Sequence, residues 1–520
     1  MTSPNPPAAA PAAAAAWSPR MWGLLFVLAG NMLIDALEVS VMVVAMPAIG
    51  DDLRLPMTEV QWAMTGFALG FGGLMLLGGR IVELLGRRPV YLIALVAFAA
   101  ASVVAGLAED AALLMATRFV KGFAAALTAP TGLAIIGAVF AEGPDRNRAV
   151  SVYALFGSCG FTAGLLLSGA LTEVSWRWAV AFPAPVVLLL FALGVRLIPG
   201  DGRVRRRTGT ARRPPADALR RLDLLGAVTF TGALLSLAFA IVSVPSAGAS
   251  GRGIRTAGCF VAAAALLAAF VRIERRAAHP LVRPSVLKAG ALPRSALGAA
   301  ALNGSYLGLL FIISFQLQST PGRGPLWTGL ALLPASAPLA VTALWSGRMV
   351  SRFGAPWLIA LGGALPLTGY LLYLLRPDPV PYASGLLPTL LLVGAGFVLA
   401  FAALNTQATA GVPEAERGPA VATYQSAVQI GAVLMLTLVA ATVTAHQQPT
   451  PDLRPAMALV SAAGLLGLVV GLAGAVARTG RHDSRTNGPR AGGTEPHGAP
   501  DLEPNTSVRP SSTGPDGSRS

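Results

Sequence analysis

Long apolar segments recur along the whole chain, and short polar or charged links separate them. A helix needs about 20 mostly apolar residues to cross a bilayer, so each such segment predicts one spanning helix. The sequence therefore predicts an all-α integral membrane protein with 14 transmembrane helices. The predicted helices lie near 22–46, 60–80, 89–108, 112–140, 149–171, 178–198, 223–245, 254–273, 295–318, 327–347, 356–375, 384–410, 419–444 and 456–477.

The charges in the links alternate in a way that supports this topology. Arginine and lysine concentrate in the cytoplasmic links of membrane proteins. Along nearly the full length every second link is rich in arginine, whereas the links between are acidic or carry few charges. The alternation favours an even number of helices and places both termini in the cytoplasm. The arginines of these links are Arg87, Arg88, Arg146, Arg148, Arg272, Arg275, Arg276, Arg283, Arg348, Arg352, Arg417 and those of the cluster at 203–221.

The composition excludes several classes of function. The chain is 54% hydrophobic and only 12% charged, where a soluble domain carries about 25% charged residues. A net charge of +15 is compatible with a nucleic-acid partner, but the basic residues lie in the membrane links, so we expect a lipid bilayer and no nucleic acid. Cys159 and Cys259 lie in apolar segments without metal-ligand spacing. We expect no metal site, and no constellation of residues indicates an enzyme.

Three stretches differ from the apolar segments in composition. Residues 1–20 are rich in Ala and Pro, and residues 479–520 are rich in Gly, Pro, Ser and charge. Both predict disordered cytoplasmic tails. The longest internal link, 199–222, separates six predicted helices from eight and contains many arginines. It predicts a flexible cytoplasmic connector near anionic lipid headgroups.

The first apolar segment carries two acids, Asp35 and Glu38. A charge near the bilayer centre costs at least about 2.5–3.5 kcal/mol, so such residues usually have a task. A spacing of three residues places both on one helical face, which should point into the protein or into a watered cavity. The fourth segment carries two cations, Arg118 and Lys121. They either pair with these acids or extend to the nearby membrane surface.

The link between the second and third segments contains Gly79, Glu83, Gly86, Arg87 and Arg88. Glycines at this spacing allow a tight turn between closely packed helices. Glu83 stands where it can pair with a basic residue and act as a conformational latch. A degraded second copy of the pattern occurs at 347–354.

This link resembles the signature loop of the major facilitator superfamily, although Leu84 stands where a basic residue is usual. The resemblance implies two six-helix bundles, here 21–198 and 291–478, with two extra helices and their link at 223–290. Further stretches resemble the fourteen-helix drug:proton antiporter branch of that superfamily, and together they cover about residues 20–478. They are Leu37-Glu38 to Ala45-Met46-Pro47, Gln61-Trp62, Ser175-Trp176-Arg177-Trp178 and Leu222-Asp223-Leu224-Leu225-Gly226.

The fifth segment contains small residues at helical spacing, with Gly157, Gly160, Gly164 and Gly169 among them. Small residues let two helix backbones approach closely. The segment resembles the antiporter motif of the branch, although Leu165 replaces its usual proline.

The resemblance implies proton-coupled export of small hydrophobic or monocationic compounds, such as antibiotics, by alternating access. Glu38 occupies the acidic position of the signature, so it is the first candidate for the proton carrier, Asp35 is the second, and Arg118 would hold the deprotonated form. Asp35 would pair with Arg118 or Lys121 or contact the substrate. We expect a monomer in the plasma membrane that uses the proton gradient and no cofactor.

Polar residues within the apolar segments are the candidates for the substrate cavity. The amides among them either line that cavity or bond neighbouring helices to each other. Two other functions stay open: transport of one specific metabolite, and a non-transporting receptor or scaffold. The candidate cavity residues are Lys121, Asn303, Gln316, Asn405 and Gln425.

Overall fold

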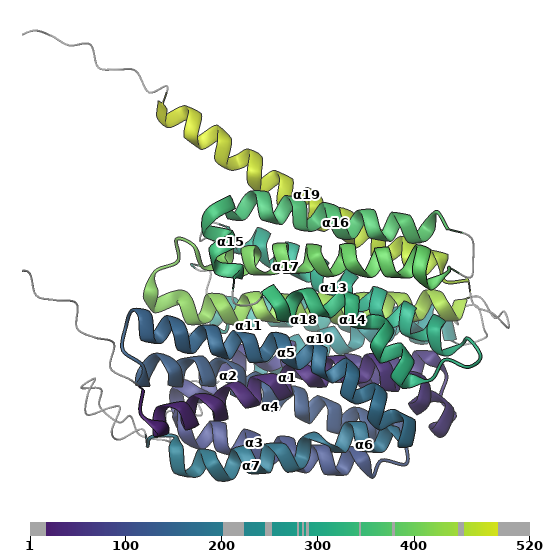
Figure 1. Ribbon diagram of the computed structural model, residues 1–520, viewed down its shortest axis with the longest axis horizontal. Helices are drawn as coiled ribbons and strands as arrows, with labels where there is room; N and C mark the ends of the chain where they lie inside the picture. Colours follow the sequence, from purple (N-terminus) through teal and green to yellow (C-terminus); the bar gives the residue numbers. More distant parts are fainter. Residues whose placement is uncertain are drawn as a thin grey trace, which may run out of the picture. The chain divides into compact units, whose positions relative to one another are not determined.

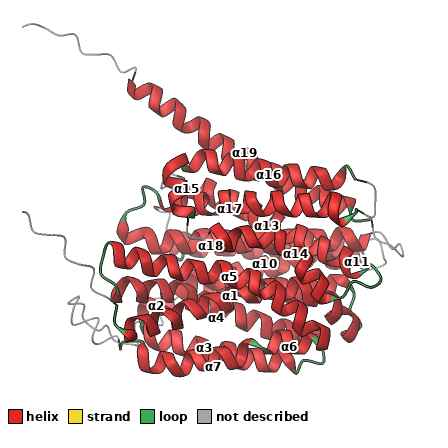
Figure 2. Ribbon diagram, in the orientation of Figure 1, coloured by secondary structure: helices red, strands yellow, loops and turns green. Residues whose placement is uncertain are grey.

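The computed structural model describes most of the chain, and in the described part it contains helices and no strand (Figure 2). The chain divides into two compact units, Met1–Val476 and Ala477–Ser520. In the second unit the described residues are helical as far as Thr486. The described residues are 17–200, 223–244, 252–277, 280–282, 285, 287, 291–342, 345–376, 380–445 and 452–486.

Fourteen helices in the described ranges are long and apolar enough to cross a membrane, which confirms the predicted number of spans. Six of them precede residue 200 and form what we call the N half (Figure 1). Its helices are α1 (Pro19–Leu53), α2 (Met57–Leu85), α3 (Arg87–Gly106), α4 (Ala111–Val139), α5 (Pro144–Val174) and the sixth span, made of α6 (Trp176–Ala181) and α7 (Pro183–Leu197).

An extra pair of helices, α10 (Leu224–Ser243) and α11 (Arg252–Arg276), precedes the remaining six spans, which we call the C half. A π-helical turn, η2 (Tyr382–Leu386), leads into one of them, and a short 3-10 helix, η3 (Glu414–Glu416), precedes another. The C half consists of α13 (Leu292–Gln318), α14 (Pro325–Thr342), the short α15 (Ser346–Phe353), α16 (Ala355–Leu374), α17 (Leu387–Thr409), α18 (Arg417–Ala445) and α19 (Arg454–Thr486).

Each half is held by its own helix contacts, and two helix pairs make the most extensive contacts between the halves. In the N half α1 packs on α5, and α4 packs on both α2 and α3. In the C half α13 packs on α18 and α17, and α16 packs on α17. The halves meet where α2 packs on α18 and where α5 packs on α14, while α10 contacts both α2 and α18. The extra pair therefore lies beside the junction of the two halves.

The helix α1 continues through Pro47 to Leu53, several residues beyond the predicted span. Proline has no backbone N–H, so the carbonyl of Val43 loses its helical donor. The hydroxyl of Ser314, on α13, donates to that carbonyl at 2.5 Å, and Nε2 of Gln318 donates to the carbonyl of Val44 at 3.1 Å. The helix can pass the proline because another helix satisfies the freed carbonyl.

The chain termini and the long link were predicted to be disordered. The last helix extends eight residues into the predicted tail, because α19 ends at Thr486. Residues 1–16, the arginine-rich link at 201–222 and residues 487–520 lie outside the described residues.

Two of the stretches that resemble the antiporter branch begin helices. Oγ of Ser175 accepts from the backbone N–H of Arg177 at the start of α6, and Oδ1 of Asp223 accepts from Gly226 at the start of α10. Such caps satisfy the free N–H groups of a first helical turn. Trp176 and Arg177 also donate to Oδ2 of Asp52, at 2.9 and 2.5 Å. This stretch therefore anchors the end of α1 to the sixth span.

The two ends of the spans differ. We call the end that carries Arg87, Arg88 and Arg146 the arginine-rich end, and the end at which α1 and α5 finish the opposite end. At the opposite end Oε1 of Glu173, the last acid of α5, accepts from the backbone N–H of Leu326 at 3.0 Å. Leu326 lies in the first turn of α14. A carboxylate of the N half therefore caps a helix of the C half.

Replacing Glu173 with alanine should weaken the contact between the halves. The change removes a cap worth roughly 0.5–2 kcal/mol and a favourable charge at a helix N-terminus worth roughly 0.3–1 kcal/mol. We expect a lower unfolding temperature of the purified protein than that of the wild type, with Glu173→Gln in between. Glu109→Ala, at an exposed acid of the same end, is the control. Equal unfolding temperatures for Glu173→Ala and this control would contradict the proposed contribution of the cap.

Candidate transport site

The predicted small-residue face of α5 brings this helix against the acidic face of α1. A methyl group added at Gly160 would lie 2.3 Å from the carbonyl oxygen of Leu33, and one at Gly164 would lie 2.9 Å from that of Leu37. Only glycine permits such close backbones. Gly157 differs, because its neighbour is the flexible side chain of Met32, 3.0 Å from an added methyl group. The glycines therefore place α5 directly along the part of α1 that carries Asp35 and Glu38.

The fourth glycine, Gly169, has a different neighbour. A methyl group there would lie 2.9 Å from Cα of Leu326 in α14. Ser168, the residue before Gly169, donates to the carbonyl of Val41 at 2.7 Å. Two different faces of α5 thus contact α1 of its own half and α14 of the other half.

Glu38 lies at the centre of a buried ion cluster. Its Oε2 accepts from Nη1 of Arg118, and its Oε1 lies 2.5 Å from Nζ of Lys121. At most 1% of each of the three side chains is exposed. The predicted pairing of the fourth-span cations with an acid of the first span is therefore present in the structure for Glu38.

Arg118 binds more than the carboxylate. Its Nη2 donates to the backbone carbonyl of Glu38 at 3.0 Å, and its Nε donates to the carbonyl of Ala63 on α2 at 2.9 Å. The guanidinium also lies over the ring of Phe67, 4.9 Å from the ring centre. A planar guanidinium suits such a fork of acceptors. Arg118 thereby links α1, α2 and α4.

Lys121, a candidate for the substrate cavity, points into the N half. Besides Glu38, its Nζ contacts the carbonyl of Val180 on α6 at 3.2 Å and lies 5.2 Å from the ring centre of Phe98 on α3. Lys121 therefore links α4 to α1, α3 and α6.

Asp35 has no such cationic partner. Its Oδ2 accepts from Nδ2 of Asn31 at 2.9 Å and from Oγ1 of Thr128 at 3.1 Å. Its Oδ1 is buried without a hydrogen-bond partner. The expected pairing of Asp35 with Arg118 or Lys121 is wrong for this structure, since both cations are taken up by Glu38.

The loop between α2 and α3 contains the predicted tight turn. Gly86 has a φ of +96°, a conformation that favours glycine, while a methyl group at Gly79 would meet nothing within 4 Å. Glu83 pairs with Arg80 at 3.2 Å, within α2. Arg80 also donates to the carbonyl of Pro280, at 3.2 Å, in the link that precedes the C half.

The two arginines of this loop begin the next helix. Arg87 and Arg88 are the first residues of α3. Nη2 of Arg88 donates to the carbonyl of Val195 on α7 at 2.7 Å. This contact holds the sixth span to the third at the arginine-rich end.

The amides of the C half that were candidates for the cavity make bonds within that half or lie half-buried. Nδ2 of Asn303 donates to the carbonyl of Val428 on α18 at 3.0 Å, and Oε1 of Gln316 accepts from the hydroxyl of Tyr373 on α16 at 2.9 Å. Asn405 and Gln425 are half-buried. For Asn303 and Gln316 the structure therefore supports the interhelical alternative.

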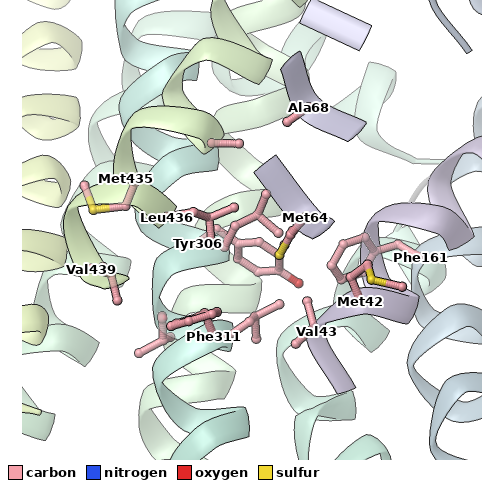
Figure 3. Packing of buried hydrophobic residues seen from close by; sticks show 14 of the residues in the cluster. Met42, Val43, Met64, Ala68, Phe161, Tyr306, Phe311, Met435, Leu436 and Val439 are labelled. Atoms are coloured by element: carbon pink, nitrogen blue, oxygen red, sulfur yellow. The ribbon is translucent and has the colours of Figure 1, made fainter. Parts of the chain in front are cut away.

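A buried apolar cluster of aromatic and methionine side chains lies where the halves meet (Figure 3). Met42, Met64 and Phe161 come from the N half and face Tyr306 of α13. The ring centres of Phe161 and Tyr306 are 5.7 Å apart, and Phe397 lies 4.5 Å beyond Tyr306. Methionine and aromatic side chains adapt to apolar molecules of different shapes. This apolar cluster was not predicted from the sequence, because its members are spread over five helices.

Two residues around Asp35 were also missed. Asn31 lies four residues before Asp35, so the spacing along one helix was a usable signal. Thr128 reaches Asp35 from another helix, and nothing in the order of residues indicates that contact. Among the described residues no group of three or more His, Cys, Asp or Glu side chains is arranged to hold a metal ion.

Replacing Glu38 with glutamine should destabilise the protein strongly. Breaking a buried ion pair by removing one partner costs about 3–5 kcal/mol, since it leaves uncompensated charge. We expect a large fall in unfolding temperature, and partial recovery in the double variant Glu38→Gln/Lys121→Gln, which keeps the net charge of the cluster. Asp35→Asn is the comparison at the neighbouring acid. A Glu38→Gln protein as stable as the wild type would contradict the structural role of the cluster.

Two solved structures of transporters have a similar fold. Structures of a nucleoside transporter and of a human organic anion transporter match it with TM-scores of 0.58 and 0.57. The match covers 86% and 88% of this chain and 98% and 100% of those chains, at 14% and 17% identity.

Closer similarity is found to two resistance proteins of Streptomyces. The puromycin resistance protein of Streptomyces alboniger is 35% identical over 425 residues, which are 81% of either chain. The lincomycin resistance protein of Streptomyces lincolnensis is 32% identical over 80% of this chain and 83% of its own. The sequence model of the family described as Major Facilitator Superfamily matches residues 28–436 of this chain. Fourteen spans in two joined halves, a buried ion cluster and this match show that the chain belongs to the major facilitator superfamily.

Proposed function

We propose that this protein exports small hydrophobic or monocationic compounds, antibiotics among them, from the cytoplasm in exchange for protons. The observation that carries the proposal is a set of buried acids and cations on α1 and α4 in a chain of this superfamily. The names of its relatives record resistance to puromycin and to lincomycin. Membrane-embedded ionisable residues mark proton and substrate pathways in transporters.

The transport cycle follows from the two-half architecture. We place the arginine-rich end in the cytoplasm, in accordance with the positive-inside rule, so that the opposite end faces outside. In this structure the halves are bonded at that outer end by Ser314, Gln318 and Glu173. Rocking of one half against the other would break these bonds and expose the site to the outside.

The substrate class follows from the side chains at the junction of the halves. Met42, Met64, Phe161 and Tyr306 form a buried apolar cluster there, which would line an apolar site when the halves part. Among the described residues of the C half, no acidic side chain is buried. A compound with two positive charges would find no second carboxylate there, whereas a neutral or monocationic compound needs none.

The remaining features complete the proposal. The protein acts as a monomer in the plasma membrane, and the proton gradient supplies the energy without a cofactor. The acids and the cation expected to couple proton and substrate are Glu38, Asp35 and Arg118, on α1 and α4.

Expression in an efflux-deficient bacterial host tests the proposal. We expect resistance to at least one compound of a panel that begins with puromycin and lincomycin. We also expect lower accumulation of that compound in the cells, which a proton uncoupler should reverse. Asp35→Asn should lose the resistance, whereas Glu142→Gln, at an exposed acid paired with Arg146, should keep it.

Each part of the proposal fails on a different result. Unchanged accumulation of every compound would overturn export of drugs and leave the metabolite or receptor alternative. Export that persists after uncoupling would overturn the proton coupling alone.

A further inference from the structure

The geometry points to Asp35, and not Glu38, as the carboxyl group that takes up and releases the transported proton, with Asn31 and Thr128 as its positioning residues. This inference rests on the proposed proton-coupled function. It reverses the assignment that the family resemblance implies, because Glu38 stands at the acidic position of the signature and Asp35 does not.

Glu38 is poorly suited to exchange a proton in this structure. Both of its carboxylate oxygens contact a cation, Oε2 that of Arg118 and Oε1 that of Lys121. A proton on Glu38 would leave two buried positive charges without their partner, and unpaired buried charge is very unfavourable. The carboxylate therefore holds the helices together in its charged form.

Asp35 is in the reverse situation. Only 3% of the residue is exposed, its two donors are the neutral groups of Asn31 and Thr128, and Oδ1 has no partner. A carboxylate with an unpartnered oxygen and no cation in contact is costly in a dry interior, whereas the neutral acid is not. In this closed, dry surrounding Asp35 therefore holds a proton.

None of the ionisable groups that interact with Asp35 supplies a positive charge. Those whose charges interact with Asp35 are Glu38 on its own helix, Tyr91 on α3 and Tyr153 on α5. From α4 the neutral Thr128 reaches Asp35, while Arg118 and Lys121 of that helix bind Glu38. None of the three interacting groups compensates a negative charge.

The cluster around Glu38 explains why the proton can leave again. One carboxylate and two cations give this cluster one excess positive charge. Asp35 lies three residues from Glu38, about one helical turn away, so ionised Asp35 would balance that excess. When water reaches the site, the O–H bond of the Asp35 acid breaks. The proton passes to that water, and the electron pair stays on the carboxylate.

Infrared spectroscopy of the purified full-length protein tests this assignment without any substrate. As the pH is raised stepwise, the wild type should lose the C=O stretching band of one buried protonated carboxyl group. Asp35→Asn should lack this band at every pH, whereas the charge-preserving double variant Glu38→Gln/Lys121→Gln should retain it. A band that persists in Asp35→Asn, or that vanishes in the double variant, would overturn the assignment.

The positioning role of Thr128 has its own readout. Thr128→Val should shift the pH at which the band disappears, and Thr128→Ser should restore it, because serine keeps the hydroxyl. Thr131→Val is the matched control, since the Thr131 hydroxyl donates within its own helix to Leu127 at 2.6 Å. An equal shift in both valine variants, or none in Thr128→Val, would contradict the role of Thr128. Because these measurements need no substrate, they can fail or succeed independently of the export assay.

Discussion

The burial of Glu38 between two cations is the interaction on which the N half depends. Charges in a dry interior are tolerated only when they are paired and hydrogen-bonded, and here four helices supply the partners. Arg118 and Lys121 come from α4, and the carbonyls that complete their bonding come from Ala63 on α2 and Val180 on α6. Neither α1 nor α4 can shift relative to the other without separating a buried charge from its partner. The cluster thus fixes the relative positions of α1 and α4, which carry Asp35 and its partner Thr128.

Close backbone packing of α5 is a second constraint on α1. The glycines of α5 press against Leu33 and Leu37 of α1 on one side and, through Gly169, against α14 on another. The same helix therefore carries the constraint from the acidic face of α1 to the junction of the two halves. In the proposed transport cycle, α5 would carry a movement between the halves to the neighbourhood of Asp35 through these close contacts.

Features that depend on residues close in sequence were predictable. The apolar segments predicted the number of helices, and the arginines predicted which links lie on the same side of the membrane. The small residues indicated that α5 packs closely on a neighbouring helix. The pairing of Arg118 with an acid of the first span also followed from the cost of buried charge. The residues alone did not show which of the two acids pairs with Arg118, because Asp35 and Glu38 share one helical face. They differ in their neighbour on α4, which is Thr128 for Asp35 and Arg118 for Glu38. Thr128, Val180 and Ser314 act across helices, so their contacts exist only after the helices have packed.

Pro47 gives the outer end of the junction a property that its polar contacts alone would not. The Val43 carbonyl lacks a donor within its own helix and is satisfied by Ser314 of the other half. When the halves part, this oxygen needs a new donor, and hydrocarbon chains of lipid have none to offer. Water that enters between the halves can replace Ser314. Separation of the halves at this point therefore favours the entry of water between α1 and α13. Entry of a lipid tail there is unfavourable, because it would leave the Val43 carbonyl without a donor.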